Sequence, residues 1–368
     1  MIGYTIVTQS DPVRVESQLI DNNILDPMYP QWLHTLFPGR NIMSLYATPF
    51  NRQSQHPYVD QEEQTVWQQF FDVCRRLVLE HPQIDLLVLE CHWDPIHLDD
   101  HWFDRQLDLV QQAAGHCRVI CLSSRCKDWY SCDLRKIWSP WFLIRRYTWQ
   151  VPQHRPYRFG YLNRRNTPHR TKLFYTMLQR PALNHKHDSF SFQYSAVNID
   201  TISHDQLVGA VRRDACRDHA THPDGFGPYG DYSLNHPAWS ANIIVVTETL
   251  DGHNELLSEK TAKAIGCQSA FVSLPRKIGL QVLTDLGFEP DYFNTDFDRT
   301  GGRDDVKDIV NFCCQFPDVE SARDFRETRI LQITHNYHWA GFDVDDIKLK
   351  PWWSRYYHRV RPVLEALG

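Results

Sequence analysis

The segment Tyr161–Arg170 (YLNRRNTPHR) contains residue types that could bind a phosphate group. It lies where the hydrophobic pattern predicts that a strand ends and a helix begins, with Pro168 in the first helical turn. Helix N-termini present N–H groups and a partial positive charge, and both favour anions. Arg164, Arg165 and Arg170 add forked, permanently charged donors that suit phosphate oxygens. The segment therefore predicts a phosphate site, with a surface turn held by ordinary ion pairs as the alternative.

A second group of polar residues follows the β-branched strand predicted at 242–247. Thr247–Thr249 ends that strand, and Ser258–Lys260 opens the next predicted helix. Because open α/β sheets bind ligands at the carboxyl ends of their strands, Glu248, Glu259 and Lys260 are expected to face one site. A carboxylate there could hold the two hydroxyls of a ribose, and the lysine could neutralise a phosphate. Alternatively, the start of the helix is only capped by Ser258 and complemented by Glu259.

Two series of alternating strands and helices are predicted to position these residues. The first series has strands at 84–89 and 118–122, separated by a helix at 99–114. The second has strands at 157–162, 242–247 and 270–274 and helices at 168–179, 258–266, 279–286, 303–316 and 319–339. The pattern breaks up between Ser123 and Pro156, which is therefore the expected inter-domain region.

The chain of 368 residues is long enough for two domains. Residues 1–150 and 151–340 are expected to form two Rossmann-like α/β domains. Residues 341–368 are expected to form a C-terminal helix that packs back on the N-terminal domain. No apolar run is long enough for a membrane helix and the first residues lack the pattern of a signal peptide, so we expect a cytoplasmic protein with no membrane partner.

Charge is distributed unevenly along the chain. The formal net charge is −6, yet the window 134–187 contains no Asp or Glu and twelve Arg or Lys residues. The rest of the chain holds 27 basic and 45 acidic residues. A cationic window in an acidic protein favours an anionic ligand there, and a solvated basic face is the alternative.

The second half of the chain, from 157 to 316, resembles the nucleotide-sugar-binding domain of inverting α1,3-fucosyltransferases and related phage and bacterial glycosyltransferases. In that family a strand ends in a Phe-Glu-Asn-Ser-like segment and is followed by a helix with Thr-Glu-Lys. Thr247–Thr249 and Ser258–Thr261 take those places here. An Asn followed by an Arg that contacts the diphosphate is matched by Asn163 and Arg170. The run 269–275 (SAFVSLP) resembles the phage branch in particular.

The resemblance implies a GT-B fold, in which two Rossmann-like domains face a central cleft. It also implies a nucleotide-diphosphate sugar as donor substrate, with no cofactor required, and it assigns no particular sugar. Glu259 would hold the ribose, Lys260 and Arg170 the diphosphate, and Glu248 would belong to the donor pocket. The complete set of expected donor-binding residues is Asn163, Arg164, Arg165, Arg170, Glu248, Glu259 and Lys260.

An inverting sugar transfer also needs a base that accepts the proton of the acceptor hydroxyl. In a GT-B enzyme this base is expected in the N-terminal domain, where 90–97 (ECHWDPIH) follows a predicted strand. Asp94 is the first candidate and Glu90 the second, and the alternative is a polar junction with solvated side chains. The stretch continues to His101 with nitrogen and oxygen ligands, but its spacing matches no recognised metal motif, so no metal site is predicted.

The acid-free window carries more cations than a diphosphate needs, and aromatic residues are interleaved with them. Such mixtures suit nucleic acid backbones and unstacked bases, although the negative net charge argues against a DNA-binding protein. Arg135, Lys136, Arg145 and Arg146 are the candidate nucleic-acid contacts. The leading acceptor candidate is a hydroxymethylated base of phage DNA, which would place a phage-encoded enzyme in the host cytoplasm. Two alternatives stay open: a non-catalytic nucleic-acid- or nucleotide-binding protein with a GT-B-like shell, and a metal-dependent hydrolase built on 92–101.

Overall fold

Contacts within the computed structural model divide the chain into two compact units. Unit 1 comprises Met1–Arg146, Asp251–Asn254 and Val344–Gly368, and unit 2 comprises Tyr147–Leu250 and Glu255–Asp343. Unit 1 is therefore formed from both terminal parts of the chain. The domain limits expected from the sequence, 150 and 340, lie close to the unit limits at 146 and 343. The structure describes residues 2–7, 28–47, 60–91, 100–144, 151–163, 170, 172–173, 176–177, 179–183, 189–192, 237–248, 250–251, 254–274, 277–290 and 305–367.

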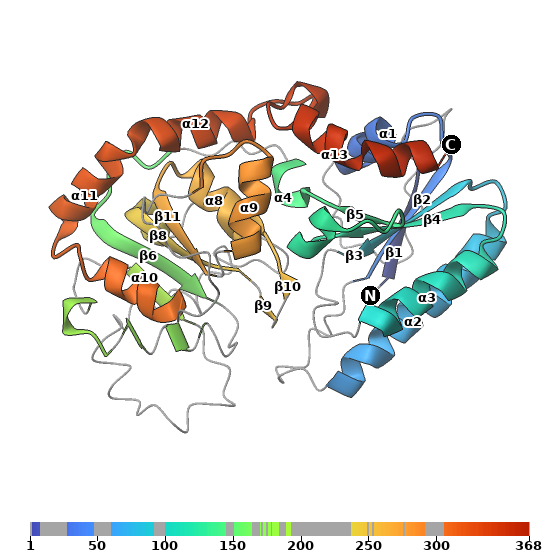
Figure 1. Ribbon diagram of the computed structural model, residues 1–368, viewed down its shortest axis with the longest axis horizontal. Helices are drawn as coiled ribbons and strands as arrows, with labels where there is room; N and C mark the ends of the chain where they lie inside the picture. Colours follow the sequence, from blue (N-terminus) through green and yellow to red (C-terminus); the bar gives the residue numbers. More distant parts are fainter. Residues whose placement is uncertain are drawn as a thin grey trace. The chain divides into compact units, whose positions relative to one another are not determined.

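Unit 1 contains a five-stranded sheet in the order β1-β2-β3-β4-β5 (Figure 1). β1 is antiparallel to β2, and every other neighbouring pair is parallel. The strands are β1 (Ile2–Val7), β2 (Ile42–Ala47), β3 (Leu86–Cys91), β4 (Arg118–Ser123) and β5 (Lys136–Trp138). The helices of this unit are α1 (Met28–Leu36), α2 (Asp60–Glu80), α3 (Asp100–Ala113), α4 (Trp141–Ile144) and α13 (Trp353–Ala366), with 3-10 helices η1 (Cys126–Tyr130) and η5 (Ile347–Leu349).

The core of unit 1 lies between this sheet and the helices α2 and α3, which run side by side (Figure 1). Side chains alternate between the two faces of a strand, so every second residue of β2 and β3 faces these helices. The strand residues in this core include Met43, Leu45, Leu87 and Leu89. From the helices, the rings of Phe71 and Phe103 meet edge to face with centroids 5.6 Å apart.

Residues 123–144 belong to unit 1 and contribute several side chains to its core, so the expectation of an inter-domain region beginning at Ser123 was wrong for this part. Trp129, Trp138 and Phe142 are each no more than 5% exposed. The rings of Trp129 and Trp138 pack edge to face at 5.3 Å. These aromatic residues lie in three short elements, η1, β5 and α4. Each element is too short for its hydrophobic periodicity to be recognised in the sequence.

The C-terminal helix α13 belongs to unit 1. Tyr356 is fully buried and its hydroxyl donates to the carbonyl of Trp138 at 3.1 Å. Arg359 Nε donates to the carbonyl of Trp129 at 2.9 Å. Burial raises the pKa of the Tyr356 hydroxyl well above its ordinary value, so it remains a hydrogen-bond donor at neutral and basic pH. These two hydrogen bonds connect α13 to β5 and η1.

Unit 2 contains a four-stranded, fully parallel sheet in the order β11-β8-β6-β7, of which β11, β8 and β6 are labelled in Figure 1. Every residue of β8 and β11 is buried, as expected for strands covered on both faces. The strands are β6 (Tyr157–Asn163), β7 (Ser189–Phe192), β8 (Ala241–Thr247) and β11 (Ala270–Leu274). The short strands β9 (Leu250–Asp251) and β10 (Asn254–Glu255) pair with each other. The helices include α8 (Glu259–Gly266), α9 (Lys277–Asp285), α10 (Asp305–Cys313), α11 (Val319–Thr328) and α12 (Ile330–Ala340), with 3-10 helices η2 (Pro181–Leu183) and η4 (Pro237–Ser240).

Local sequence signals correctly placed several helix ends of unit 2 but missed one break. Ser258 is the N-cap of α8, as predicted. Gly287, with φ of +99°, follows α9, and a side chain there would meet the Trp339 ring at 2.7 Å. The single long helix expected at 319–339 is two helices, α11 and α12, because Arg329 leaves the helical conformation at φ −110° and ψ 10°.

Parallel strands and helices make up both units, so the fold class is α/β and is compatible with Rossmann-like folds. Within the part of the chain that the structure describes, no helix combines the length and the apolar character needed to cross a membrane.

Candidate functional site

The order in which the chain adds strands reverses between β6 and β8. β7 follows β6 along the chain and lies on one side of it, whereas β8 and then β11 lie on the other side. Open α/β sheets bind ligands outside the carboxyl ends of the strands at such a reversal. The carboxyl ends of β6 and β8 are therefore the place in unit 2 where a ligand is expected.

Arg170 connects the helical segment after β6 with the end of β8. Its side chain is 2% exposed, and its Nη2 donates to the carbonyl of Thr247 at 3.1 Å. The hydroxyl of Tyr161, in β6, donates to the main-chain oxygen of Arg170 at 3.2 Å. The guanidinium that the sequence assigns to a diphosphate thus lies at the predicted edge of the sheet. Its burial shows that it also supports the fold.

Glu248 directly follows β8 and bonds the start of α8 to the end of this strand. Its side chain is 1% exposed. Oε1 accepts from the backbone N–H of Ser258 at 3.0 Å and from Oγ1 of Thr261 at 2.5 Å. Oε2 accepts from the hydroxyl of Ser258. Glu248 lies at the predicted edge, with its carboxylate oxygens bonded to the helix.

Lys260, in the first turn of α8, brings a second cation to this edge. Its Nζ lies 3.3 Å from Oγ of Ser258, and its side chain is half-buried. Together with Gly160, Trp239 and Thr247 it lines a cavity of about 10 Å³, which has room for about one water molecule. Pockets for nucleotide-sized ligands are at least about 300 Å³, so the described residues alone do not enclose a nucleotide.

The other expected donor-binding residues are placed only in part. Asn163 is the last residue of β6, where it pairs with Phe192 of β7, and Glu259 is the first residue of α8. The side chains of Asn163 and Glu259 lie outside the described residues, as do Arg164 and Arg165 altogether. The structure thus brings together Arg170, Glu248 and Lys260 from the predicted set.

The candidate bases belong to unit 1. Glu90 lies near the carboxyl end of β3 and is 7% exposed, and Ser44 Oγ of β2 donates to its carboxylate. Strand alternation places Ser44 and Glu90 on the face of the sheet away from α2 and α3. Glu90 is therefore a buried, hydrogen-bonded carboxylate and not part of a solvated junction. Asp94 lies outside the described residues.

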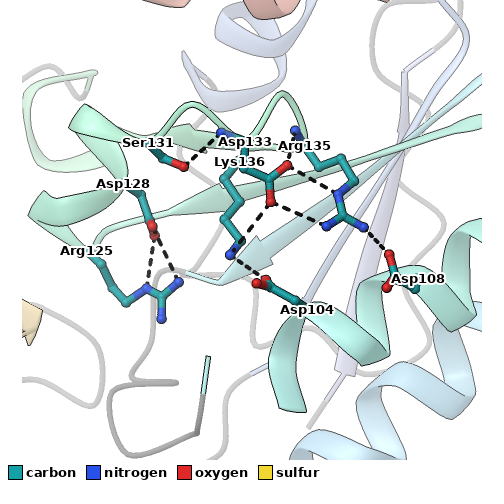
Figure 2. Close-up of polar contacts among 8 residues, drawn as sticks. All are labelled: Asp104, Asp108, Arg125, Asp128, Ser131, Asp133, Arg135 and Lys136. Carbon is teal, nitrogen blue, oxygen red and sulfur yellow. Dashed lines mark hydrogen bonds and ion pairs between the residues drawn. The ribbon is translucent and has the colours of Figure 1, made fainter. Parts of the chain in front are cut away.

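Two of the four expected nucleic-acid contacts, Arg135 and Lys136, form ion pairs within unit 1 (Figure 2). Arg135 pairs with Asp108 and with Asp133, whose Oδ1 lies 3.2 Å from its Nε. Lys136 is only 8% exposed and pairs with Asp104. Their charges are balanced locally, so these two side chains do not by themselves form a cationic surface. Arg145 and Arg146 lie outside the described residues.

The pKa of Asp133 reflects this cluster. Partial burial by itself would raise the pKa, but hydrogen bonds from Arg135 and the charges of Arg135 and Lys136 lower it below its ordinary value. Asp133 is therefore ionised down to acidic pH in the folded protein.

Several cations of the acid-free window lie inside unit 2. Arg158 is fully buried, and its guanidinium donates to the carbonyls of Phe316 at 2.6 Å and Ala182 at 3.0 Å. Arg155 is 9% exposed and donates from Nη1 to the carbonyl of Ala241 at 2.9 Å and to Ser269 Oγ at 2.7 Å. Burial lowers the pKa of Arg155. The window is thus in part a set of buried arginines that bond main-chain carbonyls, which its charge count alone does not indicate.

Residues 92–99 of the stretch considered for a metal-dependent hydrolase lie outside the described residues, so the structure bears mainly on the cysteines. Eight cysteines there are free thiols: Cys74, Cys117, Cys121, Cys126, Cys132, Cys267, Cys313 and Cys314. Burial and, to a smaller extent, the charge of Asp85 raise the pKa of Cys117 to about 11, so it is an unreactive thiol at neutral pH. The described residues contain no group of three or more His, Cys, Asp or Glu side chains that could hold a metal ion.

Sequence reasoning missed the part that Thr261 plays at this edge. The sequence pattern predicts Ser258 as a helix cap but assigns no role to Thr261 beyond its place in the family motif. A hydroxyl three residues after the cap lies on the same side of the first helical turn, and this spacing is the signal that could have linked both residues to Glu248.

Comparison of the chain with protein-family models, with curated proteins and with solved structures finds no match. The resemblance to nucleotide-sugar glycosyltransferases therefore depends on the short motifs at 163–170, 247–261 and 269–275.

Proposed function

We propose that the protein is a glycosyltransferase that transfers a sugar from a nucleotide-diphosphate donor to an acceptor hydroxyl, and that unit 2 binds the donor. One observation carries this proposal: Arg170, Lys260 and the N-terminus of α8 lie at the carboxyl ends of β6 and β8, where the strand order reverses. Cations and helix N-termini at such a reversal suit the diphosphate of a nucleotide. The motifs that resemble the glycosyltransferase family occupy this same edge.

The chemistry of sugar transfer fits these groups. When the bond between the anomeric carbon and the diphosphate breaks, negative charge develops on the leaving diphosphate. Positively charged donors that are already in position stabilise this charge without reorganising during the reaction. In this proposal Arg170 and Lys260 perform that function, and a carboxylate of unit 1, Asp94 or Glu90, accepts the proton of the acceptor hydroxyl in a GT-B arrangement.

Binding of nucleotide diphosphates tests the proposal. UDP, GDP and ADP are titrated into the protein by calorimetry, after thermal-shift screening of the corresponding sugars and of CMP-sugars to identify the base. In Lys260→Ala the affinity for the selected diphosphate should fall about 10- to 100-fold, since a charge-assisted hydrogen bond contributes about 1.5–3 kcal/mol. Lys307→Ala removes an exposed lysine of α10 in the same unit and should leave the affinity unchanged. Equal affinities in both variants would reject the donor site.

Hydrolysis of the bound donor separates an enzyme from a binding protein. The burial of Glu90 and its bond with Ser44 favour the second candidate function, a nucleotide-binding protein without catalysis, because this carboxylate is already committed within the sheet. A transferase should slowly release nucleotide diphosphate from its donor sugar without acceptor, and Asp94→Asn should reduce transfer while it leaves donor affinity intact. Binding with no release at any enzyme concentration would support the non-catalytic candidate.

A further inference from the structure

Three hydrogen bonds from the start of α8 reach the Glu248 carboxylate. The backbone N–H of Ser258 and the hydroxyl of Thr261 donate to Oε1, at 3.0 and 2.5 Å, and the hydroxyl of Ser258 donates to Oε2. Glu248 is the acceptor in all three bonds, so each of these donors is oriented toward the end of β8. At 1% exposure, Glu248 is held between strand and helix.

The hydroxyl of Ser258 links Glu248 to Lys260 through hydrogen bonds. A hydroxyl has a single hydrogen, and that of Ser258 is directed at Glu248. The lone pairs of the same oxygen therefore face Lys260, whose backbone N–H and Nζ each lie 3.3 Å from it. Glu248 thus fixes the direction of a hydrogen-bond chain that ends at the ammonium group.

We infer that Glu248 is a positioning residue, which sets Lys260 and the first turn of α8 for the diphosphate and does not itself contact the ligand. This inference rests on the proposed function and assigns to Glu248 a different part from the donor-pocket contact that the family resemblance implies. The preceding residue supports it, because the carbonyl of Thr247 accepts from Arg170. Two consecutive residues at the end of β8 therefore hold the two cations, one from each adjoining segment.

Glu248→Gln tests the inference with little change in shape. The amide oxygen can still accept from the Ser258 N–H and from Thr261, but the amide nitrogen is a donor and must compete with Lys260 for the Ser258 oxygen. With inorganic pyrophosphate as the probe, calorimetry should show about a tenfold loss of affinity. In a Lys260→Ala background the same substitution should change the affinity less than about twofold, since residues that act as a chain are not additive.

Two outcomes would overturn the inference. An equal loss in both backgrounds would mean that Glu248 acts on the ligand independently of Lys260, and no loss in either would mean that it has no part in binding. The matched control is Ser269→Ala, which removes a buried hydroxyl that donates to the Ala241 carbonyl at the amino end of the same sheet. This control should reduce stability without changing pyrophosphate affinity, so it separates positioning from general destabilisation.

Amide hydrogen exchange without ligand distinguishes failure of the inference from failure of the proposed function. If the parent protein does not bind pyrophosphate, the proposed function fails. The positioning of Lys260 by Glu248 then still predicts at least about tenfold faster exchange at the Lys260 amide in Glu248→Gln, whereas the Ser258 amide keeps its oxygen acceptor and should exchange at an unchanged rate. Unchanged exchange at the Lys260 amide would reject the positioning as well.

Discussion

The two sheets differ in the direction in which the chain adds strands. In unit 1 each new strand from β2 to β5 is placed beyond the previous one, whereas in unit 2 the chain passes from β7 back across β6 to β8 and β11. Among the described strands of these two sheets, only the second order contains a reversal, and Arg170, Glu248 and Lys260 lie beside it. The candidate site is therefore identified by where polar residues lie relative to the reversal of strand order. The number of polar residues in a segment is less informative.

The described cations of residues 125–136 in unit 1 and of residues 155–170 in unit 2 are bonded differently. In unit 1, Arg125 and Asp128 form a buried ion pair at 2.9 Å, and Arg135 and Lys136 meet carboxylates of α3 and of the preceding turn (Figure 2). In unit 2, Arg155, Arg158 and Arg170 donate to main-chain carbonyls. A charge count along the sequence treats these groups alike, although the first set is balanced by acids and the second connects segments of backbone.

The strongest test of this difference between the units is Arg158→Ala, for which we expect the largest loss of stability. Arg158→Ala removes a fully buried side chain that donates to the carbonyls of Phe316 and Ala182, so it leaves a cavity and takes a donor from two carbonyls. We expect a loss of about 4 kcal/mol in the free energy of unfolding, measured by urea denaturation. Arg180→Ala, an exposed position of the same window, should cost less than about 0.5 kcal/mol. Similar losses in the two variants would show that the buried arginines do not hold unit 2 together.

Gly160 of unit 2 and Gly115 of unit 1 allow the backbone packing of the two units to be compared. In unit 2 a Cβ at Gly160 would lie 2.0 Å from the carbonyl oxygen of Ala238, whereas in unit 1 a Cβ at Gly115 would be 3.7 Å from its nearest neighbour, the carbonyl oxygen of Gln112. Gly160→Ala should therefore destabilise the protein by about 3 kcal/mol, because backbone must shift. Gly115→Ala should change stability by less than about 1 kcal/mol. Thermal unfolding of both variants measures the difference, and equal melting temperatures would contradict it.

The smallest change in stability is expected for Asp133, an acidic residue of unit 1. Since the folded pKa of Asp133 lies below its ordinary value of 3.8, its stabilising contribution is present above that pH and is lost as the pH falls through the folded pKa. Asp133→Asn should cost up to about 1 kcal/mol at pH 7, because exposure and salt screen the ion pairs. The difference from the parent protein should narrow below pH 3.8 in urea titrations. A difference that stays constant from pH 7 to pH 3 would show that charge is not its cause.

Much of the fold could be predicted from the sequence because its strands are apolar runs. The predicted strand at 270–274 coincides with β11, and that at 242–247 differs from β8 by one residue. The prediction did not include α1 and β2. It also fused α11 with α12, because no Gly or Pro marks Arg329 as a break. Periodicity reports which residues face a core, but not where tertiary contacts interrupt a helix.

The sequence predicted where in the fold the candidate site lies, but it did not predict which side chains contact one another there. The carboxyl end of β8 and the cap at Ser258 follow from local signals. By contrast, the bond from Arg170 to Thr247 joins residues 77 positions apart, and no local pattern specifies it. Glu248 could equally have faced a ligand or a helix, because a carboxylate suits both environments. Only the fold determines which donors reach it.

The insertion of unit 2 between the two parts of unit 1 has a consequence for synthesis on the ribosome. Domains generally fold as units while the chain emerges, and all of unit 2 leaves the exit tunnel before α13 does. Until then, the hydrogen bonds from Tyr356 and Arg359 to the carbonyls of Trp138 and Trp129 cannot form. The contacts between α13 and the segment 129–138 are therefore among the last contacts of unit 1 to form during synthesis.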